Sequence, residues 1–262
     1  VGSEMCIRDR DKTTHLTMSL IATNDKIKGG YPVATDGTTD IYLTMDRKNN
    51  KTITTDKDLV PIPMLMSGQR VGVFISGASG SGKSVLTGKI IKEFIKHIPN
   101  KKKDKQPLRV VLFTGGNTPD KAFDDIKDLI TVYIRKDKNY SQITSGHLSN
   151  CITIFDDYES LDKPLFDFTL RLIRDLLEVS RKQGTHVFVI NHMTQNFNKT
   201  RSIIFECSSY ILFPSSNRNS VGRFLKAYAD FDKNEIEQIL DDNDDLFSYL
   251  YIYKASPRYI IS

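Results

Sequence analysis

One eight-residue segment, residues 77–84 with the sequence GASGSGKS, has the spacing G-x-x-x-x-G-K-[ST] of a loop that wraps nucleotide phosphates. Its glycines let successive backbone N–H groups point into one concavity, and a helix that begins near Lys83 adds the positive end of its dipole. Lys83 is expected to reach the β- and γ-phosphates, and the Ser84 hydroxyl to coordinate Mg²⁺. The alternative is a flexible Gly/Ser turn. The predicted cofactors are therefore ATP and Mg²⁺, and the predicted nucleotide-binding residues are Gly77, Ala78, Ser79, Gly80, Ser81, Gly82, Lys83, Ser84 and Val85.

Two adjacent carboxylates form the expected second half of the site. Asp156 and Asp157 follow an apolar, strand-like run at residues 151–155, and in open α/β sheets ligands bind at the carboxyl ends of the strands. Asp156 is expected to hold Mg²⁺ through a water molecule, together with Ser84 as a metal ligand, and Asp157 to polarise the attacking water. An Asp pair between a strand and a loop is also ordinary turn chemistry, and that is the alternative interpretation.

Hydrophobic patterns predict the elements that must position these residues. Residues 71–75 form an apolar, β-branched run before the loop, and apolar residues recur at helical spacing after it. The alternation of strands and helices predicts an α/β fold with a largely parallel sheet covered on both faces. Further strands are expected at residues 109–114, 131–134, 152–155, 186–190 and 210–213, and helices at residues 164–183, 221–229 and 233–240.

The two ends of the chain have different patterns. Residues 1–10, VGSEMCIRDR, show neither a signal-peptide pattern nor periodicity, and we expect a non-structural or artefactual tail. Residues 11–67 are rich in Thr, Asp, Lys and Gly and predict a small β-rich appendage. Residues 68–262 are expected to form the nucleotide-binding domain, which ends in a C-terminal hairpin over residues 249–261.

Composition limits the class of protein. The chain has 262 residues, 39% of them hydrophobic, and no apolar run near the ~18 residues that a membrane span requires, so no membrane partner is expected. Its three cysteines, Cys6, Cys151 and Cys207, share no metal-ligand spacing and fit a reducing compartment. The net charge of +5 is compatible with a polyanionic partner.

The order of motifs indicates a subclass. At least one strand, at residues 109–114, separates the loop's strand from the Asp156–Asp157 strand, and the D-x-x-G motif of GTPases is missing. This layout resembles the additional-strand, catalytic-glutamate division of P-loop NTPases, which includes RecA-like and AAA+ motors. In that division the tip of the next strand carries a polar sensor, for which Asn191 is the first candidate here and His192 the second. Both also fit as plain polar ends of a strand.

Two later stretches carry a finer resemblance. Residues 180–185, SRKQGT, look like the basic-x-x-Gly stretch at which FtsK/HerA-type DNA-pumping ATPases carry an arginine that acts on a neighbour. Residues 196–206 and 210–214 are similar to the genome-packaging ATPases of large double-stranded DNA viruses, the poxvirus-like branch of that superfamily. The resemblance covers roughly residues 61–229. The chain departs from it where many relatives have Asp-Glu in place of Asp156–Asp157, and a Gln or Ser-His sensor in place of Asn191–His192.

The resemblance implies a ring, expected to be a hexamer, with ATP at each interface and double-stranded DNA in the central channel. It also implies capsid vertex proteins as partners and a place in the cytoplasm of an infected host cell or on the capsid. Arg181 is the first candidate for the arginine that acts in trans, and Arg201 the second. For either residue the alternative is a helix-terminal or surface cation.

The favoured function is thus an ATP-hydrolysing motor that translocates double-stranded DNA into viral capsids. The alternatives are another additional-strand motor, such as a helicase or AAA+ remodeller, a P-loop phosphotransferase, and a nucleotide-gated scaffold without turnover. The sequence offers no Arg-rich lid after the third core strand, which argues against the phosphotransferase.

Overall fold

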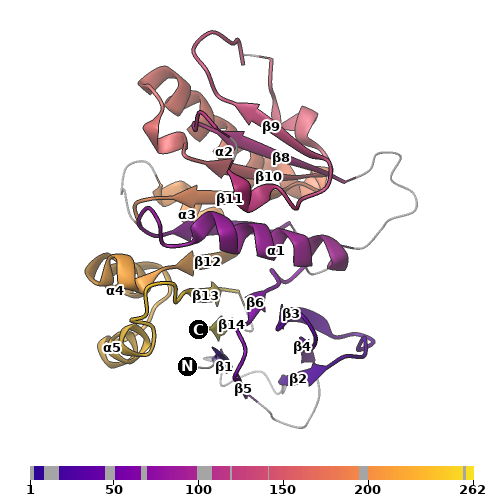
Figure 1. Ribbon diagram of the computed structural model, residues 1–262, viewed down its shortest axis with the longest axis vertical. Helices are drawn as coiled ribbons and strands as arrows, with labels where there is room; N and C mark the ends of the chain where they lie inside the picture. Colours follow the sequence, from indigo (N-terminus) through magenta and orange to yellow (C-terminus); the bar gives the residue numbers. More distant parts are fainter. Residues whose placement is uncertain are drawn as a thin grey trace.

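The structure is a computed structural model that describes residues 3–8, 18–44, 51–65, 70–98, 108–118, 120–140, 142–194, 200–255 and 258–262. Its main feature is a ten-stranded sheet whose strands are stacked along the long axis of the molecule (Figure 1). A second, four-stranded sheet lies beside one end of it. None of the helices in the described ranges is both long and apolar enough to span a membrane.

Six parallel strands form one half of the large sheet, in the order β12-β7-β11-β10-β8-β9. These strands are β7 (Gly72–Ser76), β8 (Arg109–Thr114), β9 (Leu129–Tyr133), β10 (Cys151–Asp156), β11 (His186–Asn191) and β12 (Ser209–Leu212). The order places β11 between β7, which leads into the phosphate loop, and β10, which ends in the two acids. The expected parallel α/β sheet with an additional strand is therefore confirmed.

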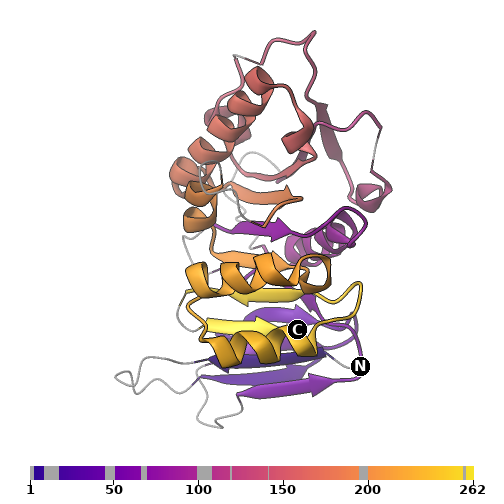
Figure 2. The same ribbon diagram turned by 90° about the vertical axis from the view of Figure 1, so that its left-hand side faces the viewer.

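The five strands inside the edge strand β9 are mostly apolar and buried because both of their faces are covered. In β8, Val111 and Phe113 join one hydrophobic core, while Val110 and Leu112 join the other. Side chains alternate between the two faces of a strand, so one continuous apolar run supplies both cores. Helix α1 (Lys83–His97) covers one face, and α2 (Lys163–Gln183), α3 (Arg201–Glu206) and α4 (Arg218–Tyr228) cover the other (Figure 2).

The helices follow the predicted apolar periodicity. Helix α2 spans the expected range and ends where Gly184 adopts a left-handed conformation (φ 66°), which glycine adopts without steric cost. Helix α4 begins three residues earlier than expected, because the Asn217 side chain accepts a hydrogen bond from the Ser220 backbone N–H and caps it. Helix α5 (Lys233–Asp242) begins with a capping box formed by Asp232 and Glu235.

Four antiparallel strands extend the sheet beyond β12, in the order β13-β14-β1-β5. They are β13 (Leu250–Tyr253), β14 (Arg258–Ile261), β1 (Ser3–Arg8) and β5 (Thr52–Thr55), and the first two are the expected C-terminal hairpin. The expectation of a non-structural tail over residues 1–10 is wrong for β1. This strand pairs with β14 and β5, and its Met5 side chain is fully buried, so the added strand completes the edge of the hairpin.

The small sheet has the order β2-β4-β3-β6, with β2 (Ser19–Thr23), β4 (Asp40–Thr44), β3 (Tyr31–Thr35) and β6 (Val60–Pro61). It shares a hydrophobic core with α1 and the C-terminal hairpin, through residues such as Leu43, Phe94 and Tyr251. Strands β4 and β5 do not pair with each other but belong to different sheets. A boundary at residue 67 therefore cuts through the large sheet, and the appendage is part of the main core.

Parts of two predicted features lie outside the described residues: residues 196–199 of the stretch 196–206, and residues 256–257 of the C-terminal hairpin. Several boundaries inside the described part differ from the expected ones by up to three residues. The strand expected at residues 131–134 spans Leu129–Tyr133.

A close approach between α1 and the short 3₁₀ helix η1 (Lys121–Phe123) gives a test of the fold. A Cβ atom on Gly88 would lie 2.3 Å from the backbone oxygen of Ala122. We expect Gly88→Ala to lower the free energy of unfolding by about 1–3 kcal/mol, despite the higher helix propensity of alanine. Chemical denaturation of both proteins measures this difference in the free energy of unfolding. The matched control is Gly222→Ala in α4, where the new Cβ meets only side-chain atoms at 3.4 Å or more, and stability should be unchanged or higher. Equal stability of Gly88→Ala and the unmodified protein would contradict this packing.

Candidate nucleotide-binding site

The predicted phosphate loop joins β7 to α1 at the carboxyl edge of the parallel strands. Gly80 and Gly82 have φ angles of 79° and 92°, in the region that favours glycine. Gly82 precedes α1 without a side-chain cap, and the first turn of the helix contains no acidic residue. The first backbone N–H groups of α1 are thus left free of side-chain acceptors, as an anion-binding helix end requires.

Gly77 has a second reason to be glycine. A Cβ atom at this position would lie 2.7 Å from Ser81 Oγ and 2.8 Å from Phe213 Cβ. Phe213 follows β12 and is buried, so the start of the loop fits against the end of the neighbouring strand. The Gly77 backbone N–H also donates to the carbonyl oxygen of Asn191 at the end of β11. Both neighbours of β7 therefore hold the beginning of the loop.

Lys83 lies inside the loop and is only 5% exposed. Its Nζ atom donates a hydrogen bond to the Ala78 carbonyl oxygen at 2.7 Å. Burial lowers the pKa of Lys83 from its ordinary value, and the nearby carboxylates of Asp156, Asp157 and Glu159 oppose this shift. The side chain is a desolvated cation that faces three acids, which suits it to a polyphosphate.

Ser84 and Asp156 bring the two halves of the site together. Ser84 Oγ donates to Asp156 Oδ2 at 3.1 Å, although the residues belong to different elements on either side of β11. Asp156 is 5% exposed, and burial, helped by the neighbouring charge of Asp157, raises its pKa to about 6. A hydroxyl beside a carboxylate is a donor set that fits Mg²⁺, which binds through one or two carboxylates and substrate phosphates rather than through a closed protein cage. In the described ranges no three His, Cys, Asp or Glu side chains gather into a metal cluster.

Asp157 differs from Asp156 in both exposure and partner. Its backbone is left-handed (φ 52°), and its half-exposed side chain places Oδ1 3.1 Å from His192 Nε2. Its backbone N–H donates to Asp156 Oδ1 at 3.0 Å. The turn thus points the second acid away from the first, toward the tip of β11.

The next two residues, which sequence reasoning did not select, also contact the tip of β11. The buried Tyr158 hydroxyl donates to Asn191 Oδ1 at 2.7 Å. The Glu159 carboxylate accepts the His192 backbone N–H at 2.6 Å, and burial raises the pKa of Glu159. The one sequence signal for Tyr158 and Glu159 as site residues is their position directly after Asp156 and Asp157. Residues 157–159 therefore form three successive links to Asn191 and His192.

Asn191 and His192, the two sensor candidates, have different surroundings. Asn191 is fully buried, and its Nδ2 atom has no hydrogen-bond partner among the described residues. The buried Ser81 Oγ, in the loop itself, is also without a partner there. Buried polar atoms are normally satisfied, so these two are the polar atoms of the site that a ligand or water would satisfy. His192 is exposed and pairs with Asp157.

The two arginine candidates lie at different places in the fold. The backbone of Arg181 is in the last turn of α2, near the amino ends of β10 and β11, and β11 spans roughly 20 Å from that edge to the loop edge. Arg201 is an exposed residue in the first turn of α3, with its guanidinium 5.6 Å from the centre of the Phe205 ring. Within one chain the structure does not bring Arg181 to the phosphate loop.

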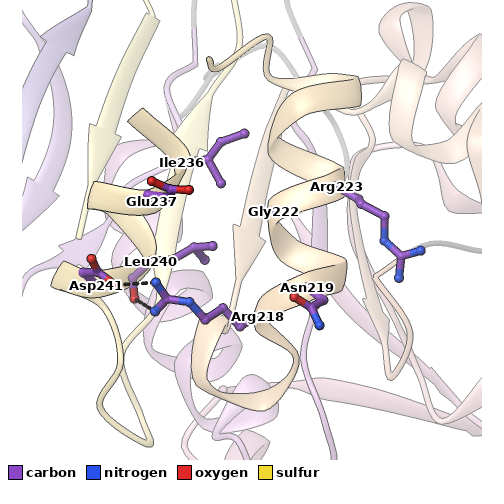
Figure 3. Close-up of a pocket in the computed structure, with 8 residues that line it drawn as sticks. All are labelled: Arg218, Asn219, Gly222, Arg223, Ile236, Glu237, Leu240 and Asp241. Atoms are coloured by element: carbon purple, nitrogen blue, oxygen red, sulfur yellow. Dashed lines mark hydrogen bonds and ion pairs between the residues drawn. The ribbon is translucent and has the colours of Figure 1, made fainter. Parts of the chain in front are cut away.

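Two cavities lie near these elements. One of about 270 Å³ is lined by Tyr158, Glu159, Phe166, Leu170, His192, Met193 and Thr200, beside the acid turn. The other, of about 480 Å³, lies between α4 and α5 (Figure 3). There Arg218 is held by the Leu240 carbonyl oxygen and the Asp241 carboxylate, while Arg223 points away from α5. Neither cavity is lined by residues of the phosphate loop.

Comparison with known proteins gives distant similarities. No family model matches the sequence. The uncharacterized protein V3 of Sputnik virophage is 25% identical over 221 residues, which are 82% of this chain and 83% of that protein. The genome packaging NTPase B204 of Sulfolobus turreted icosahedral virus 2, in complex with sulfate, superposes with a TM-score of 0.48 and 16% identity over 73% of this chain and 95% of that one. The cytoplasmic domain of the Thermomonospora curvata type VII secretion ATPase EccC superposes with a TM-score of 0.46 and 14% sequence identity, over 91% of this chain and 29% of that one.

The strand order and the loop conformation together define the fold class. A phosphate loop leaves β7, the acid pair ends β10, and β11 lies between them at the same edge of the sheet. The chain therefore has a P-loop NTPase fold with an additional strand, a mostly parallel core flanked by helices, and a small antiparallel sheet in its N-terminal part.

Proposed function

We propose that this chain is an ATP-hydrolysing motor that translocates double-stranded DNA, and that its role is to package a viral genome into capsids. One observation carries the ATPase part: the 3.1 Å contact between Ser84 Oγ and Asp156 Oδ2 joins the phosphate loop to the acid pair. The DNA-packaging part rests on the sequence resemblance of residues 180–185, 196–206 and 210–214, with a net charge of +5 that suits contacts to phosphates.

Each residue of the site has a proposed task. The loop N–H groups and Lys83 hold the triphosphate, and Ser84 and Asp156 hold Mg²⁺, which neutralises phosphate charge when bound. Asp157 is exposed enough to meet a water molecule, and its 3.1 Å contact with His192 orients the carboxylate. Asp157 is therefore the proposed general base. Asn191, with an unsatisfied Nδ2, is the proposed sensor, and His192 supports Asp157.

A further cation would stabilise the charge that develops on the phosphates, and Arg181 lies at the opposite edge of the sheet from the phosphate loop of its own chain. A ring of subunits, proposed to be hexameric, would supply such a cation from a neighbour. Arg181 is the first proposed residue for this role and Arg201 the second. Capsid vertex proteins as partners and a location in the infected host cell belong to the same proposal.

The first test asks whether the protein hydrolyses ATP at the phosphate loop and whether duplex DNA stimulates this activity. We expect ATPase activity to rise with added duplex DNA, and Lys83→Ala to abolish both ATP binding and turnover because it removes the buried cation of the loop. Phosphate release and titration calorimetry measure these effects. The control is Lys89→Ala, an exposed lysine of the same helix, which should change neither. The proposal would be contradicted if the ATPase rate did not change with added DNA and was also unchanged in Lys83→Ala. Stimulation by single-stranded DNA alone would indicate a helicase, and phosphate transfer to an acceptor a phosphotransferase.

The second test separates the two acids. We expect Asp157→Asn to leave ATP affinity largely intact and lower kcat by about 10²-fold or more, because an amide still contacts His192 but cannot accept a proton. Asp156→Asn should instead weaken the Mg²⁺-dependent part of ATP binding. Binding and single-turnover measurements on both variants distinguish the roles. An equal loss of binding and turnover in Asp157→Asn would make this residue a metal ligand rather than a base.

The third test asks whether an arginine acts on a neighbour. An arginine supplied in trans is worth about 10³ to 10⁵ in rate, so Arg181→Ala alone should be nearly inactive. Mixing it with Lys83→Ala subunits should restore part of the activity, since some interfaces then contain an intact Lys83 and an intact Arg181. The same mixture with Arg201→Ala tests the second candidate. If native mass spectrometry shows mixed rings and activity does not return, Arg181 has no role in trans.

A further inference from the structure

An exposed turn between α5 and β13 carries two large apolar side chains. The Ser248 backbone N–H donates to the Asp245 carbonyl oxygen at 3.0 Å, which places Leu246 and Phe247 at the two central positions. They are 65% and 64% exposed. Central turn positions usually hold Gly, Pro, Asn, Asp or Ser, and folding buries little of these two side chains. The turn geometry does not explain why both residues are apolar.

This turn lies directly against the phosphate loop. A Cβ atom placed on Gly82 would be 3.7 Å from Phe247 Cδ1. Ser215 Oγ donates to the Leu246 carbonyl oxygen at 3.0 Å, so the segment after β12 holds the turn in place. Val85, in the first turn of α1, is also 53% exposed. Phe247 therefore presents an exposed aromatic ring beside Gly82, the residue before Lys83, and the turn that carries it is held in place.

The order of strands gives the direction in which a nucleotide must lie. The acids end β10, two strands from β7 on one side, while β13 lies two strands from β7 on the other. Residue Leu250, which begins β13, pairs with Leu212 at the end of β12, so the turn stands at the loop edge. A triphosphate whose γ-phosphate faces the acids extends its α-phosphate and ribose toward β12 and β13. Phe247 lies on that side.

The charges around the turn select which part of the nucleotide fits. Asp242, Asp244 and Asp245 precede Leu246 and are exposed. Carboxylates repel phosphates, so this surface does not suit the charged half of the ligand. A purine base is neutral, has a flat face for an aromatic ring, and carries N–H donors for carboxylate acceptors.

We propose that Phe247, with Leu246 beside it, is the platform on which the purine base of the bound nucleotide stacks. This inference rests on the proposed binding of a triphosphate by the loop, and it adds the part of the site that recognises the base. It assigns a binding role to a turn that lies about 160 residues after the phosphate loop in the sequence.

The first experiment compares ATP with inorganic tripolyphosphate by titration calorimetry in the presence of Mg²⁺. Removing one stacked aromatic should weaken binding about 5- to 100-fold. We therefore expect Phe247→Ala to weaken ATP by that factor and to leave tripolyphosphate unchanged, and Phe247→Tyr to restore ATP affinity. The control is Ile130→Ala, a 45% exposed side chain on the distant edge strand β9. Its affinities for both ligands should match those of the unmodified protein.

The second experiment uses the absence of tryptophan from this chain. In Phe247→Trp the new side chain is the sole tryptophan, and stacking of a purine should quench its fluorescence. We expect ATP to quench it and tripolyphosphate to leave it unchanged, while Lys83→Ala in the same background should move the ATP response to much higher concentrations.

The outcomes separate this inference from the proposed function. If the unmodified protein binds neither ATP nor tripolyphosphate, the loop is not a triphosphate site and both proposals fail. If it binds both and Phe247→Ala changes neither affinity, only the stacking platform is overturned. A Phe247→Ala variant that keeps its ATP affinity but loses self-association would show instead that the turn is a contact between subunits.

Discussion

The site depends on one constraint: the phosphate loop and the acid pair must meet at the same edge of the sheet with one strand between them. The parallel direction of β7, β11 and β10 brings all three carboxyl ends to that edge. The hydrogen bond between Ser84 and Asp156 spans the width of β11. Reversing β7 would move Lys83 to the opposite edge, and reversing β10 would move the acids there, roughly 20 Å away.

The additional strand also carries the polar groups between the two halves. Its last residue, Asn191, contacts the loop through the Gly77 N–H and the acid turn through Tyr158. Asp157 and Glu159 add the links to His192. Because these bonds come from consecutive residues on both elements, the tip of β11 and the acid turn cannot shift independently without breaking them, including the buried bond of Tyr158. A movement of the acid turn when phosphates bind or leave would therefore also move the tip of β11.

Much of the core was predictable because its signals are local. Strands buried on both faces read as continuous apolar runs, and β8 and β11 were located within one residue at each end. The glycines and Lys83 form a contiguous motif whose geometry depends on a few backbone angles. The motif and the position of the acids therefore suffice to predict the fold class from the sequence.

The missed features depend on partners far away in the sequence. β1 lies between β14 and β5 and becomes regular only by pairing with these two strands, so its own pattern is weak. Tyr158 and Glu159 resemble ordinary turn residues until β11 is placed beside them. The sequence does not indicate that Phe247 lies beside the phosphate loop, because this follows from the contact of its turn with Gly82, 165 residues earlier in the chain.

Lys83 has a partner of its own within the loop, the Ala78 carbonyl oxygen at 2.7 Å. An incoming triphosphate must therefore take the ammonium from a neutral acceptor instead of meeting a bare buried charge. The contribution of Lys83 to the free energy of binding is the difference between two hydrogen-bonded states of this side chain, and it is smaller than the full ammonium–phosphate attraction. When phosphate departs, the same carbonyl accepts a hydrogen bond from the ammonium again, so product release does not leave the buried Lys83 side chain without an acceptor.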